Sequence, residues 1–200
     1  MLSALLDAGL LVSSGIACCW LLLLALRLVF GEKRWSAAGD ALFALAMDRV
    51  FSRQIRERLD DTKARLFADL KTQLSADESL RQDSALNMLE IGVGTGANLE
   101  FYPAGSRLTC VDANPAFESY FRERCGAAAS HLRPPLRFLV ADAGDMPAVA
   151  SDSMDAVVAT LLFCNMERAA PVLSEVKRVL APGGRFYFIE HVAAREGTWR

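Results

Sequence analysis

The chain has 200 residues, of which 52% are hydrophobic, and its mean hydropathy of +0.22 is high for a protein without membrane segments. It carries 22 Lys and Arg residues against 24 Asp and Glu residues, a formal net charge of −2, so no overall basic field favours nucleic acid as a partner. Its five cysteines form no C-x-x-C pair, which argues against a zinc site and a disulfide framework and favours a reducing compartment.

The excess hydrophobicity is concentrated in residues 8–26. This segment has no charged residue, and 15 of its 19 residues are hydrophobic. Without it, the rest of the chain is about 49% hydrophobic, an ordinary value for a globular domain. A helix of this length spans roughly 28 Å, close to the ~30 Å hydrocarbon core of a bilayer. We therefore expect residues 1–34 to form an N-terminal membrane anchor with one membrane helix.

The residues on either side of the apolar segment predict whether it is cleaved and how it is oriented in the membrane. Residues 1–7 contain no Lys or Arg, and no small-residue cleavage site follows, so an uncleaved anchor is favoured over a signal peptide. Arg27, Lys33 and Arg34 follow the segment, and the positive-inside rule then places the rest of the chain in the cytosol. Because glycines and serines weaken the first half of the helix, a monotopic insertion is the alternative.

Residues 35–84 are expected to form a helical connector. The apolar residues that recur at intervals of three and four are Phe43, Ala46, Met47, Val50 and Phe51, and later Leu66, Phe67, Leu70 and Leu74. Residues 27–58 carry a net charge of +3, which suits either an anionic cytosolic leaflet or a solvated helix face. The polar residues 75–84 predict the last connection before the main domain.

From residue 85 to residue 200, short apolar runs alternate with helical stretches, which predicts an α/β domain with a parallel sheet covered on both faces. The expected strands are residues 86–91, 107–112, 136–140, 155–160 and 185–190. One helix is expected from after Pro115 to near Gly126. Another is expected to open at Pro171 and to stop at Pro182-Gly183-Gly184.

A glycine-rich turn, Glu90-Ile91-Gly92-Val93-Gly94-Thr95-Gly96, directly follows the first expected strand. Glycine lets the backbone turn tightly and approach a ligand closely. Twenty residues after Gly92, Asp112 ends the second strand, where a carboxylate can accept both ribose hydroxyls of a nucleoside. The turn and Asp112 also satisfy a dinucleotide-binding pattern, so a nicotinamide-dependent reductase is one hypothesis.

Two further motifs favour another family. Val140-Ala141-Asp142-Ala143 ends the third strand and is followed by Asp145-Met146-Pro147 and Asp152-Ser153-Met154-Asp155, and residues 175–184 (EVKRVLAPGG) precede the fifth strand. Together with the glycine turn and Asp112, this ordered set resembles the class I S-adenosylmethionine-dependent methyltransferases over residues 85–191. The resemblance implies a Rossmann-like sheet and S-adenosylmethionine as the cofactor.

A narrower resemblance rests on the N-terminal segment, on GTGAN at residues 94–98 with FYP at 101–103, on TCVD at 109–112 with Asn114-Pro115, and on residues 186–193. These features are similar to those of the membrane-anchored, methyltransferase-like thiol S-methyltransferases of the endoplasmic reticulum and lipid droplets. The resemblance implies S-methylation of a small alkyl thiol at those membranes. Val93 departs from the family, where Cys is common.

The cofactor-binding residues that the resemblance implies are Glu90, Gly92, Gly94, Gly96, Asp112, Ala113, Asp142 and Ala143. The glycines would pack against the methionine and ribose portions of the cofactor, and Glu90 would place its ammonium end. Asp112 would hold the ribose hydroxyls, and Asp142 would accept from the adenine amino group. The apolar loop around Met146 would cover the adenine ring.

The acceptor side is less clearly marked. An alkyl thiol is mostly neutral at pH 7, so its proton must be taken up before or during transfer. His191, just after the fifth strand, is the catalytic candidate, with a structural hydrogen-bonding histidine as the alternative. Cys164 and Asn165 follow the fourth strand, where related folds contact substrate, but a packed Cys and a turn Asn are the more ordinary interpretations there.

The class I fold normally carries seven strands, the last two forming an antiparallel pair, whereas five are found here. Nine residues follow His191, so we expect a sheet truncated after its fifth strand, in a fragment or a short form. Two alternatives to thiol methylation stay open. One is methylation of a lipid or a quinone, and the other is a membrane-anchored cofactor-binding protein with little turnover.

Overall fold

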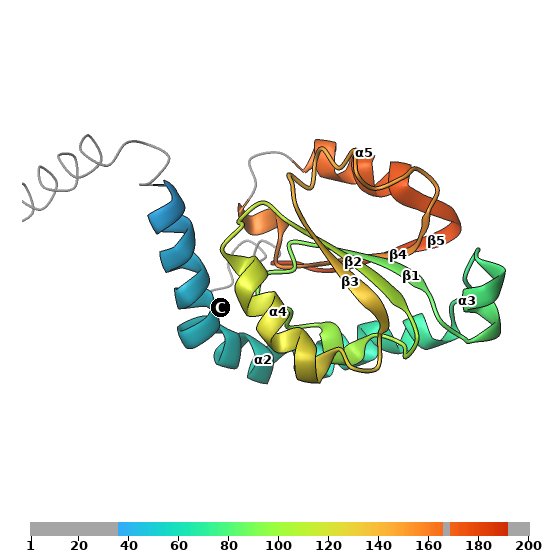
Figure 1. The fold of residues 1–200 in the computed structure, drawn as a ribbon, viewed down its shortest axis with the longest axis horizontal. Helices are drawn as coiled ribbons and strands as arrows, with labels where there is room; N and C mark the ends of the chain where they lie inside the picture. The colour runs from blue at the N-terminus through green and yellow to red at the C-terminus, as the bar shows by residue number, and fades with distance from the viewer. Residues whose placement is uncertain (1–35, 166–168, 192–200) are drawn as a thin grey trace, which may run out of the picture. The chain divides into compact units, whose positions relative to one another are not determined.

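The computed structural model describes residues 36–165 and 169–191 (Figure 1). Residues from Ala44 onward form one compact unit, distinct from a unit that ends at Phe43. Much of the predicted connector therefore belongs to the same unit as the sheet. The predicted membrane anchor, residues 1–34, lies outside the described residues. Within the part of the chain that is described, no helix combines the length and the apolarity needed to cross a membrane.

Five parallel strands form the sheet in the order β3-β2-β1-β4-β5. The strands are β1 (Asn87–Ile91), β2 (Arg107–Asp112), β3 (Arg133–Val140), β4 (Met154–Thr160) and β5 (Leu180–Ile189). This confirms the predicted parallel α/β sheet. All strands run the same way, so their carboxyl ends share one edge, the carboxyl edge, and their amino ends share the amino edge. The strand order reverses between β1 and β4, and ligands of such sheets bind outside the carboxyl ends at that point.

Three strands begin earlier than predicted, β4 by a single residue and β3 and β5 by more. β3 includes Pro134 and Pro135, which an edge strand tolerates because one side of it needs no backbone N–H. β5 starts at Leu180, which pairs with Met154, whereas the next pair joins Ala156 to Arg185. Residues 181–184, which contain the predicted helix stop, therefore form a bulge inside β5. Among the described residues, β3 and β5 each pair on one side only.

The helical elements follow the predicted pattern closely. They are residues 36–46, η1 (Met47–Phe51), α2 (Ser52–Phe67), η2 (Ala68–Thr72), α3 (Glu78–Gln82), η3 (Leu99–Phe101), α4 (Phe117–Ala128), η4 (Phe163–Asn165) and α5 (Ala170–Val179). The short helix α3 lies where only a polar connection was expected. It forms because the Asp77 carboxylate accepts from the backbone N–H groups of Ser79 and Leu80 and caps the helix.

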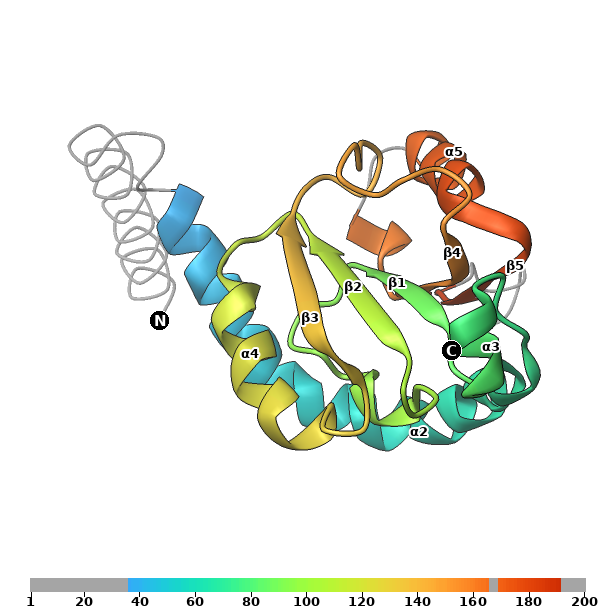
Figure 2. The same ribbon diagram turned by 45° about the vertical axis from the view of Figure 1, so that its right-hand side comes forward.

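Helices α2 and α4 cover one face of the sheet and α5 covers the other (Figures 1 and 2). Side chains alternate between the faces along each strand. On β1, Met88 packs in the core beneath α2 and α4, whereas Leu89 and Ile91 pack in the core beneath α5. By the same alternation Glu90 faces the α2 side. The sheet therefore delivers a carboxylate at the end of β1 to the face that α2 covers.

Candidate functional site

The glycine turn lies at the carboxyl edge, directly after β1. Gly92, Gly94 and Gly96 have φ angles of +69°, +52° and +76°, which L side chains rarely adopt. A Cβ at Gly92 would lie 2.8 Å from Cδ1 of Leu162, whereas a Cβ at Gly94 would meet nothing within 4 Å. A side chain at Gly92 would therefore displace the Leu162 side chain, whereas Gly94 leaves backbone open to a ligand.

Asp112, the last residue of β2, is joined to this turn. Its Oδ2 accepts from the Gly94 N–H at 2.9 Å, and its Oδ1 accepts from the Asn114 N–H at 2.9 Å. Burial raises the pKa of Asp112, while these two backbone hydrogen bonds act in the opposite direction. A carboxylate has about four lone-pair sites, so each oxygen can still accept one hydroxyl. Two adjacent ribose hydroxyls match this arrangement. Ala113, beside Asp112, is exposed.

Glu90 is buried at the end of β1. Its Oε1 accepts from Nδ2 of Asn98 at 2.7 Å, and the same amide donates to Oγ1 of Thr160 at 3.1 Å. Its Oε2 is buried without a hydrogen-bond partner. Burial raises the pKa of Glu90 to about 7, although Tyr102, Asn98 and Lys63 lower it. The Tyr102 hydroxyl lies near enough to act on that pKa, yet it makes no hydrogen bond of acceptable geometry.

The residues at this site have the hydrogen-bonding capacity and the space that S-adenosylmethionine needs. A buried carboxylate oxygen without a partner is costly, and a cationic ammonium group would satisfy it. Asp112 offers the lone pairs that a ribose diol needs, and Gly94 leaves the space that a close ligand needs. The predicted residues Glu90, Gly92, Gly94, Gly96 and Asp112 are therefore brought together at one place.

The third predicted region follows β3. Asp142 is exposed, and its Oδ1 accepts from the Gly144 N–H at 2.7 Å, while Ala143 is buried. In the loop that is predicted to cover the adenine ring, the side chain of Met146 is 1% exposed and packs in the core beneath α5. The loop is held by α5, since the Met146 N–H donates to Oε2 of Glu175 at 2.8 Å.

The predicted acceptor side is only partly assembled by the described residues. His191 is exposed directly after Glu190, whose Oε1 accepts from the backbone N–H groups of Leu162 and Phe163 at 2.6 and 2.9 Å. Glu190 therefore fixes the loop that follows β4. Cys164 in this loop is exposed, and its thiol donates to the Leu161 carbonyl at 3.2 Å. The side chain of Asn165 lies outside the described part of the chain.

Sequence reasoning missed Lys63, which lies in the charged part of the predicted connector. It is 1% exposed, and its Nζ donates to the Ala97 carbonyl at 3.3 Å, at the end of the glycine turn. Its Nζ also lies 5.8 Å from the ring centroid of Phe101. One signal pointed to it: Lys63 precedes Leu66 and Phe67 by three and four residues, which places it on the apolar face of the helix.

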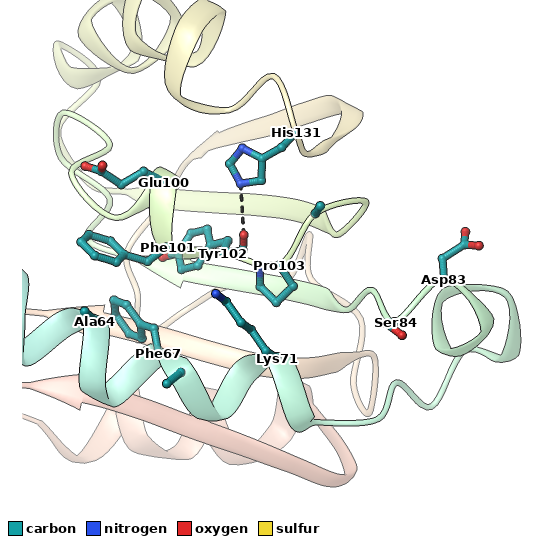
Figure 3. Close-up of a pocket in the computed structure, with 12 residues that line it drawn as sticks. Ala64, Phe67, Lys71, Asp83, Ser84, Glu100, Phe101, Tyr102, Pro103 and His131 are labelled. Carbon is teal, nitrogen blue, oxygen red and sulfur yellow. Dashed lines mark hydrogen bonds between the residues drawn. The ribbon is translucent and has the colours of Figure 1, made fainter.

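A cavity of about 550 Å³ lies elsewhere (Figure 3). Ser84, Ala104 and His131 line it, and each shortly precedes a strand, so the cavity belongs to the amino edge. Lys71 reaches into it from η2, and the His131 ring is hydrogen-bonded to the Tyr102 carbonyl at 3.1 Å. None of the predicted cofactor residues lines this cavity. It is therefore distinct from the glycine-turn site.

This chain is similar to known proteins over much of its length. The model of a methyltransferase-domain family matches residues 89–188. Human thiol S-methyltransferase TMT1A is 44% identical over 143 residues, 72% of this chain and 55% of that protein. Human thiol S-methyltransferase TMT1B is 38% identical over 179 residues, 90% of this chain and 70% of that protein. The chain thus spans between about half and about two thirds of the length of these relatives.

Among solved structures, a complex of the Haloferax volcanii Trm112 methyltransferase activator with a candidate methyltransferase superposes with a TM-score of 0.55 at 23% identity. The match covers 73% of this chain and 58% of that one. At this identity the likeness concerns the fold alone. It agrees with the α/β fold of the described residues.

Proposed function

This chain belongs to the class I S-adenosylmethionine-dependent methyltransferases, and from that premise we propose that it transfers a methyl group to the sulfur of a small alkyl thiol. The observation that supports cofactor binding is that two carboxylates stand ready at the same end of the sheet: Asp112, which the glycine turn orients, and Glu90, which has one oxygen without a hydrogen bond. The thiol as acceptor is supported by the similarity to TMT1A and TMT1B.

The residues at the carboxyl edge bind and orient the cofactor. When bound, S-adenosylmethionine supplies a methyl group activated by a sulfonium. Asp112 holds the ribose, Glu90 receives the ammonium end, and Asp142 with the Ala143 N–H meets the adenine. Because the methyl group is already activated, alignment of the acceptor with it in a dry site provides most of the rate.

The proton of the thiol requires an acceptor, and His191 is the candidate in this chain. Its exposed ring follows β5, next to the loop that Glu190 holds. Replacement of His191 by Ala is expected to reduce kcat at pH 7 about tenfold or more, as removal of a general base does. At pH 9 the variant should regain much of the lost rate, because thiols ionise there without a base. A loss that is equal at both pH values assigns His191 a structural role.

We further propose that the N-terminal segment anchors the protein in the endoplasmic reticulum membrane, and on lipid droplets, with the methyltransferase domain in the cytosol. The basic residues that follow residues 8–26 support this orientation. Leu42, Phe43 and Leu45 are 67%, 47% and 43% exposed in the helical segment that comes next in the chain. Exposed apolar side chains close in sequence to an anchor suit a membrane surface.

The test is a radiolabelled methyl-transfer assay on membranes that contain the full chain, with an alkyl thiol, a phenol and a lipid fraction as acceptors. We expect label in the thiol alone, and its loss in Asp112→Ala. Label in the lipid fraction would instead favour a lipid or quinone methyltransferase. Binding of the cofactor without product from any acceptor would favour a binding protein with little turnover.

A further inference from the structure

The starting observation is a lysine that α2 buries beneath the glycine turn. Burial of an ammonium group is costly unless other groups compensate its charge. Lys63 is 1% exposed, and its Nζ donates to the carbonyl of Ala97, the residue that follows Gly96, at 3.3 Å. The next residue, Asn98, donates to Glu90 at 2.7 Å. Lys63 therefore reaches the turn at the point where the turn is tied to Glu90.

The surroundings of Glu90 give this lysine a particular importance. Among the described residues, the titratable groups that act on Glu90, or on which it acts, come from four elements: Lys63 on α2, Tyr102 after η3, Cys110 and Asp112 on β2, and Cys125 on α4. Of these, Lys63 is the one cation. Asn98 and Thr160 add polar but uncharged groups. The remaining groups are neutral or negative, so they do not favour a negative charge on Glu90 by Coulomb attraction.

We propose that Lys63 is a positioning residue for the cofactor: it holds the end of the glycine turn through the Ala97 carbonyl and preserves the negative charge of Glu90, to which the ammonium end of the cofactor binds. The inference rests on the proposed function, in which Glu90 receives that ammonium group. It assigns a role in the cofactor site to α2, which precedes the strands in sequence and shares no motif with them. Burial raises the pKa of Glu90 to about 7, and the charge of Lys63 opposes that rise.

The test is the affinity of the full chain in detergent micelles for S-adenosylhomocysteine, which has the same ammonium end. Isothermal titration calorimetry from pH 6 to pH 9 would compare the wild type with Lys63→Gln and Lys63→Met. Gln retains a donor for the Ala97 carbonyl but lacks the charge, and Met lacks both. The ratio of variant to wild-type affinity at each pH cancels the titration of the ligand's own amino group, which is the same in both titrations.

We expect Lys63→Gln to bind about five- to tenfold more weakly than the wild type at pH 7, because the pKa of Glu90 rises further without the lysine charge and the carboxylate is less often charged. The ratio should return toward one at pH 9, where Glu90 is charged in both proteins. In a Glu90→Gln background the same substitution should change affinity by less than about twofold. Lys71→Gln, an exposed lysine on η2, is the matched control and should leave affinity unchanged.

A loss of affinity that is equal at every pH, or that persists undiminished in the Glu90→Gln background, would overturn the proposal and leave Lys63 a purely structural role. No loss in either lysine variant would overturn it as well. If Lys63→Met does not fold, Lys63→Gln alone decides. Failure of the wild type to bind S-adenosylhomocysteine at any pH would instead refute the proposed function. The pKa of Glu90 in the ligand-free variants, measured by carboxyl carbon NMR, would then still test the effect of Lys63.

Discussion

Two buried carboxylates, one at each edge of the sheet, have opposite surroundings. Asp155, at the amino edge in β4, accepts from Oγ of Ser75 at 2.5 Å and from the backbone N–H groups of Ala76 and Asn87, both at 2.7 Å. Glu90, at the carboxyl edge in β1, has one oxygen with no hydrogen bond. A buried carboxylate whose oxygens all accept hydrogen bonds from the protein stabilises the fold. A buried carboxylate with an oxygen that accepts none costs stability, and it is suited to receive a donor from a ligand.

The difference also separates structural motifs from functional ones. Asp155 ties the segment before β1 to β4, and the backbone carbonyl of Asp155 accepts from the Gln73 side chain as well. Glu90 ties the glycine turn to Asn98 but retains capacity for a cation. Both residues belong to the motifs that suggested the family. The hydrogen bonds around each residue distinguish them: those of Asp155 indicate a role in stability, and those of Glu90 indicate a role in binding.

The largest effect is expected at Asp155. Asp155→Ala would leave three donors without an acceptor, one of them buried and two partly buried, so the free energy of unfolding should fall by about 4 kcal/mol. Urea unfolding of the full chain measures this loss, with the exposed Asp152→Asn as a control that should change stability by less than about 0.5 kcal/mol. The affinity of the remaining folded protein for S-adenosylhomocysteine should not change. A large loss of affinity at Asp155 would remove the contrast between the two edges.

Asp112→Ala should have the next largest effect, on binding. Two hydrogen bonds from ribose hydroxyls to a charged group would be lost, so affinity for S-adenosylhomocysteine should fall about 100-fold, or about 2.7 kcal/mol. The circular dichroism spectrum should stay intact. Calorimetric titration measures the loss, and Asp145→Ala, an exposed carboxylate after β3, is the control. Unchanged affinity in Asp112→Ala would contradict the assignment of the carboxyl edge as the cofactor site.

Glu90→Gln should stabilise the ligand-free protein, in contrast to Asp155→Ala. Because the pKa of Glu90 is raised to about 7 from its ordinary value of 4.5, its contribution to stability is fully present below pH 4.5 and is lost as the pH rises through 7. The variant should therefore equal the wild type near pH 4.5 and exceed its free energy of unfolding by about 2 kcal/mol at pH 8. Equal stability at pH 8 would show that Glu90 carries no such cost.

The smallest effect is expected at Arg178 on α5. Its guanidinium donates to the carbonyls of Met146 and Val149 at 2.9 and 2.8 Å and pairs with Glu175, so it fixes the loop after Asp142. Arg178→Leu should weaken binding of S-adenosylhomocysteine about three- to tenfold, because the adenine side of the site is less ordered. Lys177→Leu, at an exposed neighbouring position, should have no effect. A loss of 100-fold would mean that Arg178 contacts the ligand itself.

The sequence predicts the sheet and the glycine turn well because both depend on short-range patterns. The apolar runs of the five strands and the spacing from Gly92 to Asp112 are visible in the chain alone. The start of β5 was missed because proline and glycine end most helices and strands, whereas here they form a bulge. The burial of Lys63 and the filled acceptors of Asp155 depend on contacts 34 and 68 to 80 residues away. Local patterns carry no information on such distances.

The most direct test is the titration of Glu90 itself by carboxyl carbon NMR, in the full chain with and without S-adenosylhomocysteine. We predict a pKa of about 7 in the free protein and a clear fall when the ligand is bound, because its ammonium group favours the charged carboxylate. The signal of Asp155 should not respond to the ligand. A pKa of Glu90 that the bound ligand leaves unchanged would contradict the account, since the unsatisfied carboxylate would then not be part of the cofactor site.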